Sequence, residues 1–336
     1  AEPAPLPPAP AAPQPAPPRQ AAPAVKAVSP RARRLIRECA VSAEPIPGSG
    51  PGGRVVEKDV RAYLDSHHYD ALKITPAAKA LARAEGIDLL ALPQDVPGER
   101  ITVEAVERAV AEKPKPMSKM RQVIAQRLTA SFTGTPHFYV TVAADMTGLL
   151  ALHKQWKAEK RPVSVTDFIL KASALALVKF PALNSSTDGR MTRWHSRVHL
   201  GLAVSVPEGL VVPVIRGADT LSLPALHERA RELAAKARAG KLTPDEMSGS
   251  TFTVSNMGML DVDHFTAIIN PGESAILAVA STRPTPVVRD GSVVIREMMN
   301  LTVSSDHRLV DGATAARFVN HIKQLLEDPD TWKRLI

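Results

Sequence analysis

Proline restricts this chain more than any other residue, because many of its 30 copies are clustered near the start of the sequence. Residues 1–28 are almost entirely alanine and proline, and Glu2, Arg19 and Lys26 are their only charged side chains. Such a composition offers no apolar face to bury, so we expect this segment to be an extended, polyproline-like linker. A linker of this kind tethers whatever it carries and raises its local concentration.

After this linker, a short pattern occurs twice at an offset of 46 residues. Ser29 and Thr75 each precede a proline, and an N-cap residue followed by proline is a strong helix start. Each copy continues with a Pro-Gly loop and a second helix, which opens near Glu57 or Val103. The pattern therefore predicts a duplicated helix–loop–helix module. The predicted modules are residues 29–64 and 74–111, and the predicted linkers are 65–73 and 112–116.

The two copies differ in charge and in their loops. Residues 29–64 hold seven basic and four acidic side chains, a balance of +3, whereas residues 75–110 hold four basic and six acidic side chains, a balance of −2. Three glycines of the first loop are replaced in the second by Gln94, Val96 and Glu99. Two roles stay open for the second copy: a site for a different partner, or a spacer.

Residues 117–336 alternate helical and β-prone segments, which predicts a two-layer α/β domain with a mixed sheet. Helices are expected at 118–132, at 165–180 with Ser164 as N-cap, and at 223–239 with Ser222 as N-cap. Strands are expected at 138–142, 198–206, 210–215, 251–255, 275–280, 293–297 and 301–305. We therefore expect a large domain at residues 117–336, preceded by two small helical modules.

A polar motif runs from Asp306 to Gly312, between the last expected strand and a further helix. His307 is held there by rigid elements on both sides, as a catalytic base would be, and imidazole titrates near neutral pH. We expect Asp306 and Arg308 to form an orienting ion pair, and Asp311 to cap the helix that follows. Judged by spacing alone, a structural histidine is the more frequent outcome.

The string Asp306-His307-Arg308-Leu309-Val310-Asp311-Gly312 resembles the signature of the dihydrolipoamide acyltransferases, the core components of 2-oxo acid dehydrogenase complexes. The resemblance extends from Met117 to the end of the chain and includes three further segments in the same order: 117–128, 251–258 and 269–272. It implies a fold like that of chloramphenicol acetyltransferase. It also implies transfer of an acyl group, with acetyl favoured, in a complex of the pyruvate dehydrogenase type.

The same resemblance implies roles for three residues. His307 would deprotonate the thiol of coenzyme A, or dihydrolipoamide in the reverse direction, and Ser255 would donate a hydrogen bond to the oxyanion. Asp311 matches a position that the family fills with Asp or Asn, and its carboxylate near His307 would support the protonated imidazole while it also caps the helix. The family forms homotrimers in which the histidine of one subunit meets the serine of its neighbour, and the trimers build a larger core. A lipoyl group and coenzyme A carry the acyl group, no metal is expected, and a non-catalytic scaffold is the alternative.

The first module resembles the peripheral subunit-binding domain of the same complexes. The two arginines that contact partners in that family fall on Arg33 and Arg54. Their implied partners are the 2-oxo acid decarboxylase and dihydrolipoyl dehydrogenase. The family's usual lipoyl domain is not visible in the sequence, which starts at Ala1 instead of methionine, so we expect a fragment or a processed product.

Composition narrows the remaining possibilities. No run of 18 apolar residues occurs, so a membrane span is not expected. The formal net charge of +8 suggests an anionic partner, but 4% aromatic residues and the lack of zinc-ligand spacing argue against nucleic acid. The single cysteine, Cys39, is expected in a helical core and fits a reducing compartment. We therefore expect a bacterial cytoplasmic protein, with the mitochondrial matrix as the alternative.

Overall fold

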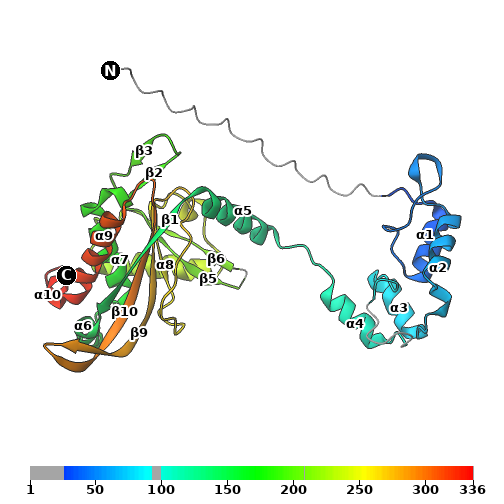
Figure 1. Cartoon of the computed structure of the whole chain (residues 1–336). Coiled ribbons are helices and arrows are strands. Elements are labelled where there is room, and N and C mark those ends of the chain that lie inside the picture. Colours follow the sequence, from blue (N-terminus) through cyan, green and yellow to red (C-terminus); the bar gives the residue numbers. More distant parts are fainter. Residues whose placement is uncertain (1–25, 93–99, 208, 336) are drawn as a thin grey trace, which may run out of the picture. The chain divides into compact units, whose positions relative to one another are not determined.

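The structure, a computed structural model, describes residues 26–92, 100–207 and 209–335. The chain divides into two compact units, Ala1–Pro116 and Met117–Ile336 (Figure 1). The first unit consists of short helices, and the second is built on a six-stranded sheet. Among the described residues, no helix is long and apolar enough to cross a membrane.

The helices of the first unit begin where the caps predict. The Ser29 hydroxyl accepts a hydrogen bond from the Ala32 N–H, and the Thr75 hydroxyl accepts the equivalent bond from the Ala78 N–H. The elements are α1 (Pro30–Cys39), η1 (Pro51–Gly53), α2 (Glu57–Ser66), η2 (Tyr69–Ala71), α3 (Pro76–Glu85) and α4 (Val103–Glu112). Each pair of helices therefore has the cap-and-proline start that the repeated sequence pattern encodes.

The segment 65–73, which we expected to be a linker, is folded. Helix α2 continues to Ser66, and the turn η2 follows it. Tyr69 is buried, and its hydroxyl donates a hydrogen bond of 2.7 Å to the carbonyl oxygen of Cys39. Cys39 is itself buried, as expected for a small core residue. The apolar ring of Tyr69 explains the difference, because burying it removes a large surface from water.

The sheet of the second unit has the strand order β1-β10-β9-β8-β4-β7. Its strands are β1 (His137–Asp145), β4 (Leu200–Leu202), β7 (Val214–Ile215), β8 (Phe252–Asn256), β9 (Ala275–Arg289) and β10 (Ser292–Asp306). Two small hairpins flank it: β2 (Ser185–Thr187) with β3 (Thr192–Trp194), and β5 (Val204–Val206) with β6 (Gly209–Val211). Strand β8 is parallel to β4 and β9, whereas the other pairs are antiparallel, so the predicted mixed α/β fold is confirmed.

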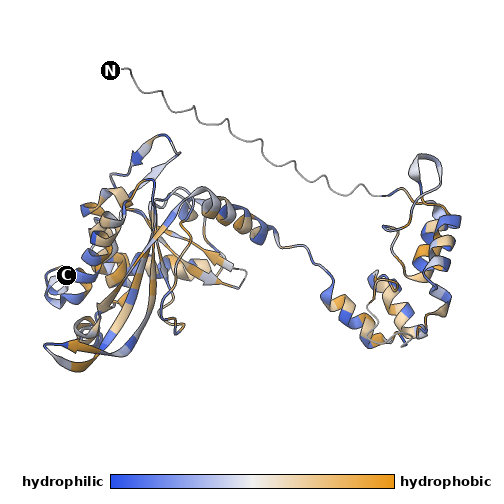
Figure 2. Cartoon of the chain, viewed as in Figure 1, coloured by the Kyte–Doolittle hydropathy of each residue, from blue (hydrophilic) through white to orange (hydrophobic). Residues whose placement is uncertain are grey.

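Helices pack on one face of this sheet to form the main core. These helices are α6 (Thr147–Ala158), α7 (Val165–Lys179), α8 (Leu223–Arg238), α9 (Gly312–Glu327) and α10 (Pro329–Arg334), whereas α5 (Lys119–Gly134) contributes no residue to this core. Leu277 and Leu301 of the sheet lie in one buried cluster with Phe168 of α7 and Phe318 of α9. Figure 2 shows apolar colour concentrated along the central strands and mixed colour on the surrounding helices, as expected for amphipathic elements.

Two groups of strands differ from expectation. The expected strands 293–297 and 301–305 are one continuous strand, β10, whose register against β9 shifts between Met299 and Leu301. Such a bulge inserts one residue without ending the strand. The opposite holds for 198–215, where four short strands, β4 to β7, replace the two that we expected. Helix α6 was not predicted.

Candidate functional site

His307 lies in the tight turn between β10 and α9. Its backbone N–H donates a 2.9 Å hydrogen bond to the carbonyl oxygen of Pro136, just before β1. The imidazole packs edge-on against the ring of Phe138, with 4.9 Å between ring centroids and 80° between planes. A Cβ atom on Gly312 would lie 3.1 Å from the same phenyl ring, so glycine lets α9 start close to it. The imidazole is therefore held on one side and exposed on the other.

The predicted ion pair between Asp306 and Arg308 is present. Asp306 is 2% exposed, and its carboxylate accepts hydrogen bonds from Arg308 Nε at 2.9 Å and Nη2 at 2.7 Å. The Asp306 N–H donates to the carbonyl oxygen of Ser274, at the start of β9. The hydrogen bonds that Arg308 donates to Asp306 raise the pKa of Arg308. Each charge is thus bound by the other, and the pair fixes the turn that carries His307.

Asp311 caps helix α9, as the sequence predicts. Its carboxylate accepts hydrogen bonds from the Thr314 N–H at 2.7 Å and from the Thr314 hydroxyl at 3.0 Å. The backbone hydrogen bond from Thr314 is the largest cause that lowers the pKa of Asp311. Within the described ranges, no hydrogen bond joins Asp311 to His307. The carboxylate is therefore held by the start of α9 and not by the imidazole.

Ser255 lies on β8 and faces away from the helices. Its neighbour Val254 is buried in the main core, and side chains alternate along a strand. Ser255 stands opposite Ala278 on β9, which in turn stands opposite Thr302 on β10. The hydroxyl is therefore presented on the sheet face opposite the helical layer.

One chain does not bring Ser255 and His307 together. Thr302, which is level with Ser255, precedes His307 by five residues, or roughly 16 Å at about 3.3 Å per residue. Ser255 is on β8 and His307 follows β10. Strand β9 lies between these two strands, so the two residues are also about 10 Å apart across the sheet. The resulting separation of roughly 19 Å is far beyond a hydrogen bond. A site that uses both groups needs two copies of the chain.

Glu273 is a buried polar residue that the sequence reasoning missed. It precedes β9 and is only 6% exposed. Its Oε1 accepts three hydrogen bonds, from Ser250 at 2.5 Å, Thr253 at 2.8 Å and Asn270 at 2.7 Å. These bonds join the beginning of β8 to the turn before β9. A glutamate directly before an apolar strand was the signal in the sequence.

The environment of Glu273 favours a neutral carboxyl group. Burial raises its pKa to about 7, although the three hydrogen bonds oppose this shift. Its Oε2 is buried and has no hydrogen-bond partner among the described residues, which suits a protonated acid better than a carboxylate. Asp306 and Arg308, which line a cavity of about 230 Å³ together with Glu273, are neutralised by each other. The acid thus lies between the strand of Ser255 and the turn of His307.

The two expected partner-binding residues lie on the surface of the first unit. Arg33 is on α1 and Arg54 follows η1, and both are exposed. Neither guanidinium group forms a hydrogen bond or ion pair with another residue that the structure describes. The loop before Arg54 requires glycine, because a Cβ atom on Gly48 would lie 2.1 Å from the carbonyl oxygen of Gly53. Both guanidinium groups are available for an external acidic group.

The arrangement of possible metal ligands is the remaining feature of the site. In the described part of the chain, no group of three or more His, Cys, Asp or Glu side chains is placed to hold a metal ion.

Two family descriptions match parts of the sequence. Residues 109–333 match the 2-oxoacid dehydrogenases acyltransferase (catalytic domain). Residues 26–61 match the e3 binding domain. The e3 binding domain match thus falls on the first helical module and ends before the second module begins.

Individual proteins are similar over most of the chain. A dihydrolipoyllysine-residue acetyltransferase component of a mitochondrial pyruvate dehydrogenase complex, from Schizosaccharomyces pombe, is 36% identical over 90% of this chain and 60% of its own length. The corresponding component of the acetoin cleaving system of Bacillus subtilis is 39% identical over 77% of this chain and 70% of its own. The chain thus spans between 60% and 70% of the length of these relatives.

A solved structure is similar to the second unit in fold and sequence. The dihydrolipoamide acetyltransferase of Azotobacter vinelandii is 39% identical, has a TM-score of 0.63, and covers 66% of this chain and 93% of its own. That structure concerns the catalytic role of a serine, a histidine and an asparagine. Their spacing equals the spacing of Ser255, His307 and Asp311.

Proposed function

This chain belongs to the family of 2-oxoacid dehydrogenase acyltransferases, and we propose that it transfers an acyl group between a dihydrolipoyl arm and coenzyme A. The observation that carries the proposal is the placement of His307 on a rigid turn, exposed, at the family's spacing from Ser255. An acetyl group is the proposed acyl group, because the named relatives are acetyltransferases.

In the proposed reaction, the imidazole of His307 removes the proton from the thiol of coenzyme A. The thiolate attacks the thioester carbonyl of acyl-dihydrolipoamide, and the Ser255 hydroxyl donates a hydrogen bond to the resulting oxyanion. The tetrahedral intermediate then expels the dihydrolipoamide thiolate, which takes the proton from the imidazolium. Positioning both groups before reaction lowers the barrier, because neither must reorganise when charge develops.

We further propose that each active site lies between two subunits of a homotrimer. The separation of roughly 19 Å between Ser255 and His307 in one chain supports this arrangement, because a hydroxyl of a second copy must supply the oxyanion hydrogen bond. Such trimers would form the core of a larger complex. A bacterial cytoplasm is the proposed compartment, and the buried free Cys39 suits its reducing conditions.

The first helical module is the proposed docking site for partner enzymes. The match of residues 26–61 to an e3 binding domain supports dihydrolipoyl dehydrogenase as one partner. The decarboxylase of the complex is proposed as a second partner of the same face. Exposed Arg33 and Arg54 would bind acidic groups on these proteins.

The catalytic proposal is tested with the chain as it stands, acetyl-coenzyme A and free dihydrolipoamide. Loss of the thioester and formation of acetyl-dihydrolipoamide are expected, at a rate proportional to the concentration of assembled protein. A panel with succinyl- and branched acyl-coenzyme A would establish the acyl preference. An intact trimer without turnover on any of these substrates would instead support a scaffold of the same complex.

A further inference from the structure

The second helical module repeats the first in three dimensions, at the same offset of 46 residues. Helix α3 begins and ends 46 residues after α1. The isolated bridge between Val28 and Val55 recurs between Ile74 and Ile101. We call residues 28–66 the first lobe and residues 74–112 the second lobe. The helices and the bridge of the second lobe thus repeat those of the first, although its loop sequence and its charge differ.

The two lobes are packed against each other. The Leu89 N–H of the second lobe donates a 2.9 Å hydrogen bond to the carbonyl oxygen of Ala40 in the first. Tyr69, which lies between the lobes, packs in one cluster with Cys39 of the first lobe and Leu90 of the second, and its hydroxyl donates to the Cys39 carbonyl oxygen. The Ala40 side chain belongs to the buried cluster of the second lobe, together with Ala82. Buried hydrogen bonds and a shared apolar cluster make the connection between the lobes rigid.

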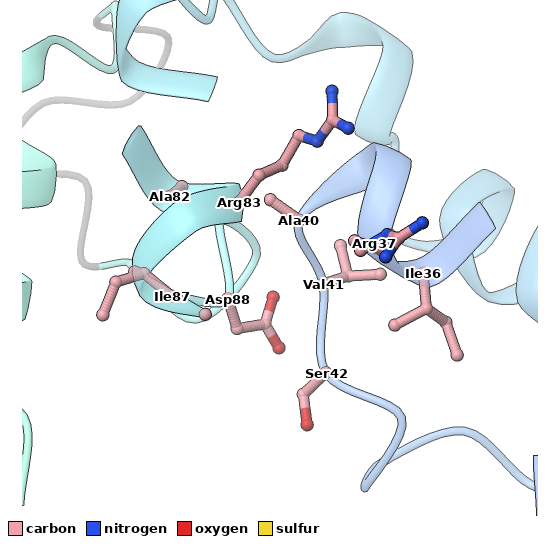
Figure 3. Close-up of a pocket in the computed structure, with 10 residues that line it drawn as sticks. Ile36, Arg37, Ala40, Val41, Ser42, Ala82, Arg83, Ile87 and Asp88 are labelled. Carbon is pink, nitrogen blue, oxygen red and sulfur yellow. The ribbon is translucent and has the colours of Figure 1, made fainter. Parts of the chain in front are cut away.

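Equivalent residues of both lobes line the groove at this contact (Figure 3). Ile36 and Val41 of the first lobe lie there, and so do Ala82 and Ile87, which follow them by 46 residues. All the lining residues form such pairs. The lobes therefore meet through corresponding surfaces, at the carboxyl ends of α1 and α3.

One pair of corresponding charged positions, Arg33 and Lys79, is used differently in the two lobes, whereas Arg54 and its equivalent Arg100 are both exposed. Arg33 is exposed, and its guanidinium group makes no hydrogen bond or ion pair within the described chain. Its equivalent, Lys79, is half-buried, and its ammonium group lies 5.4 Å from the centroid of the Tyr69 ring. A cation over an aromatic face is attracted to it, so this charge is engaged within the chain. The balance of −2 over residues 75–110 further opposes binding of an acidic partner.

We propose that the two lobes form one rigid unit with a single face for acidic partners, carried by the first lobe, and that the second lobe braces this face. The proposal rests on the partner-binding function proposed for Arg33 and Arg54. A lobe of about 40 residues has little core of its own, so a shared core stabilises it. A face that is already ordered loses less entropy when a partner binds.

The single-face part is tested by calorimetric titration of dihydrolipoyl dehydrogenase into the full chain. Arg33→Ala should weaken binding at least about tenfold, and Lys79→Ala less than about twofold, with one binding event per chain. A second binding event, or equal weakening by both variants, would overturn the single-face proposal. An Arg33→Ala variant that binds normally would instead contradict the proposed partner-binding function.

The bracing part is tested by hydrogen exchange of the Val55 amide, which donates to the Ala27 carbonyl oxygen in the first lobe. Tyr69→Ala should lower its protection at least about tenfold, because the contact between the lobes is lost. Tyr69→Phe keeps the ring and should cause a smaller drop. Glu107→Ala, an exposed change on α4, is the matched control and should leave Val55 protected. Unchanged protection in Tyr69→Ala would refute bracing.

Discussion

The two units of this chain hold their charged groups in opposite ways. In the sheet unit, Asp306 and Glu273 are buried, and each accepts several hydrogen bonds from neighbouring elements. In the helical unit, the guanidinium groups of Arg33 and Arg54 are exposed and make no hydrogen bonds within the described chain. Buried groups fix distances and respond to pH, whereas exposed charges attract partners and respond to salt. We therefore expect changes in the sheet unit to alter the rate or the stability, and changes in the helical unit to alter partner affinity.

The largest expected effect is that of His307→Ala. Loss of the proposed general base should reduce kcat by about 10²- to 10⁴-fold, because the thiol must then ionise without help. Steady-state turnover of free dihydrolipoamide measures the effect. Sedimentation should show an unchanged assembly, since the ring of His307 is exposed on one side. A variant that retains full activity would remove the histidine from the mechanism.

Ser255→Ala should reduce kcat by about 10²- to 10³-fold and leave KM nearly unchanged, because the oxyanion forms only during reaction. Steady-state turnover of free dihydrolipoamide measures both constants.

Trimers that contain both variants test whether the serine and the histidine come from different subunits. If each site takes its serine and histidine from different subunits, equal mixing of Ser255→Ala and His307→Ala chains should restore about one quarter of the sites. Activity no higher than that of either parent would place both groups in one chain.

Sequence reasoning succeeded where a feature is local. The N-caps Ser164, Ser222 and Asp311 were predicted because each cap bonds a backbone N–H three residues ahead, which the sequence alone reveals. It failed for contacts between distant segments. The hydrogen bond from Tyr69 to Cys39 spans 30 residues, and nothing within a single helix or strand predicts it.

The difference between local and distant contacts also explains which site residues the sequence predicted. The pair of Asp306 and Arg308 lies within three residues and was predicted. The bonds of Glu273 to Ser250 and Thr253 come from another strand, and depend on how the sheet is assembled. The roles of the site residues came from a resemblance of motifs, because spacing alone left His307 ambiguous.

The buried acid gives the next largest effect, on stability. With a folded pKa of about 7 and an ordinary value of 4.5, Glu273 stabilises the fold fully below pH 4.5. As the pH rises from 4.5 to 7 this contribution to the unfolding free energy is lost, and the loss amounts to about 3 kcal/mol. Glu273→Gln mimics the neutral acid, so its advantage in unfolding free energy over the parent should grow from pH 4.5 to 7 and then stay constant. Glu228→Gln, an exposed change, is the control. A pH-independent difference would mean that Glu273 does not gain a charge in this range.

The functions of the two units should differ in their sensitivity to salt. Raising the ionic strength from about 0.05 to 0.5 M should weaken partner binding roughly tenfold, because exposed charges such as Arg33 are screened. The turnover of free dihydrolipoamide should change much less, since Asp306 is buried and holds Arg308 through several short hydrogen bonds. Titration and turnover measured in the same buffers test this. Equal sensitivity of both would remove the contrast between the units.

The smallest expected effect is that of Asp311→Asn, which tests whether the carboxylate has a role beyond the cap. Asparagine caps helices as well as aspartate, so the unfolding free energy should hardly change, whereas Asp311→Ala removes the cap and should lower it measurably. If the cap is the whole role, kcat of Asp311→Asn should stay within about twofold of the parent, because the turn of His307 is unchanged. A loss above about tenfold at unchanged stability would show that the negative charge itself supports the imidazolium of His307. Asp311 would then affect the rate through its charge, although its side chain is exposed and is hydrogen-bonded to Thr314.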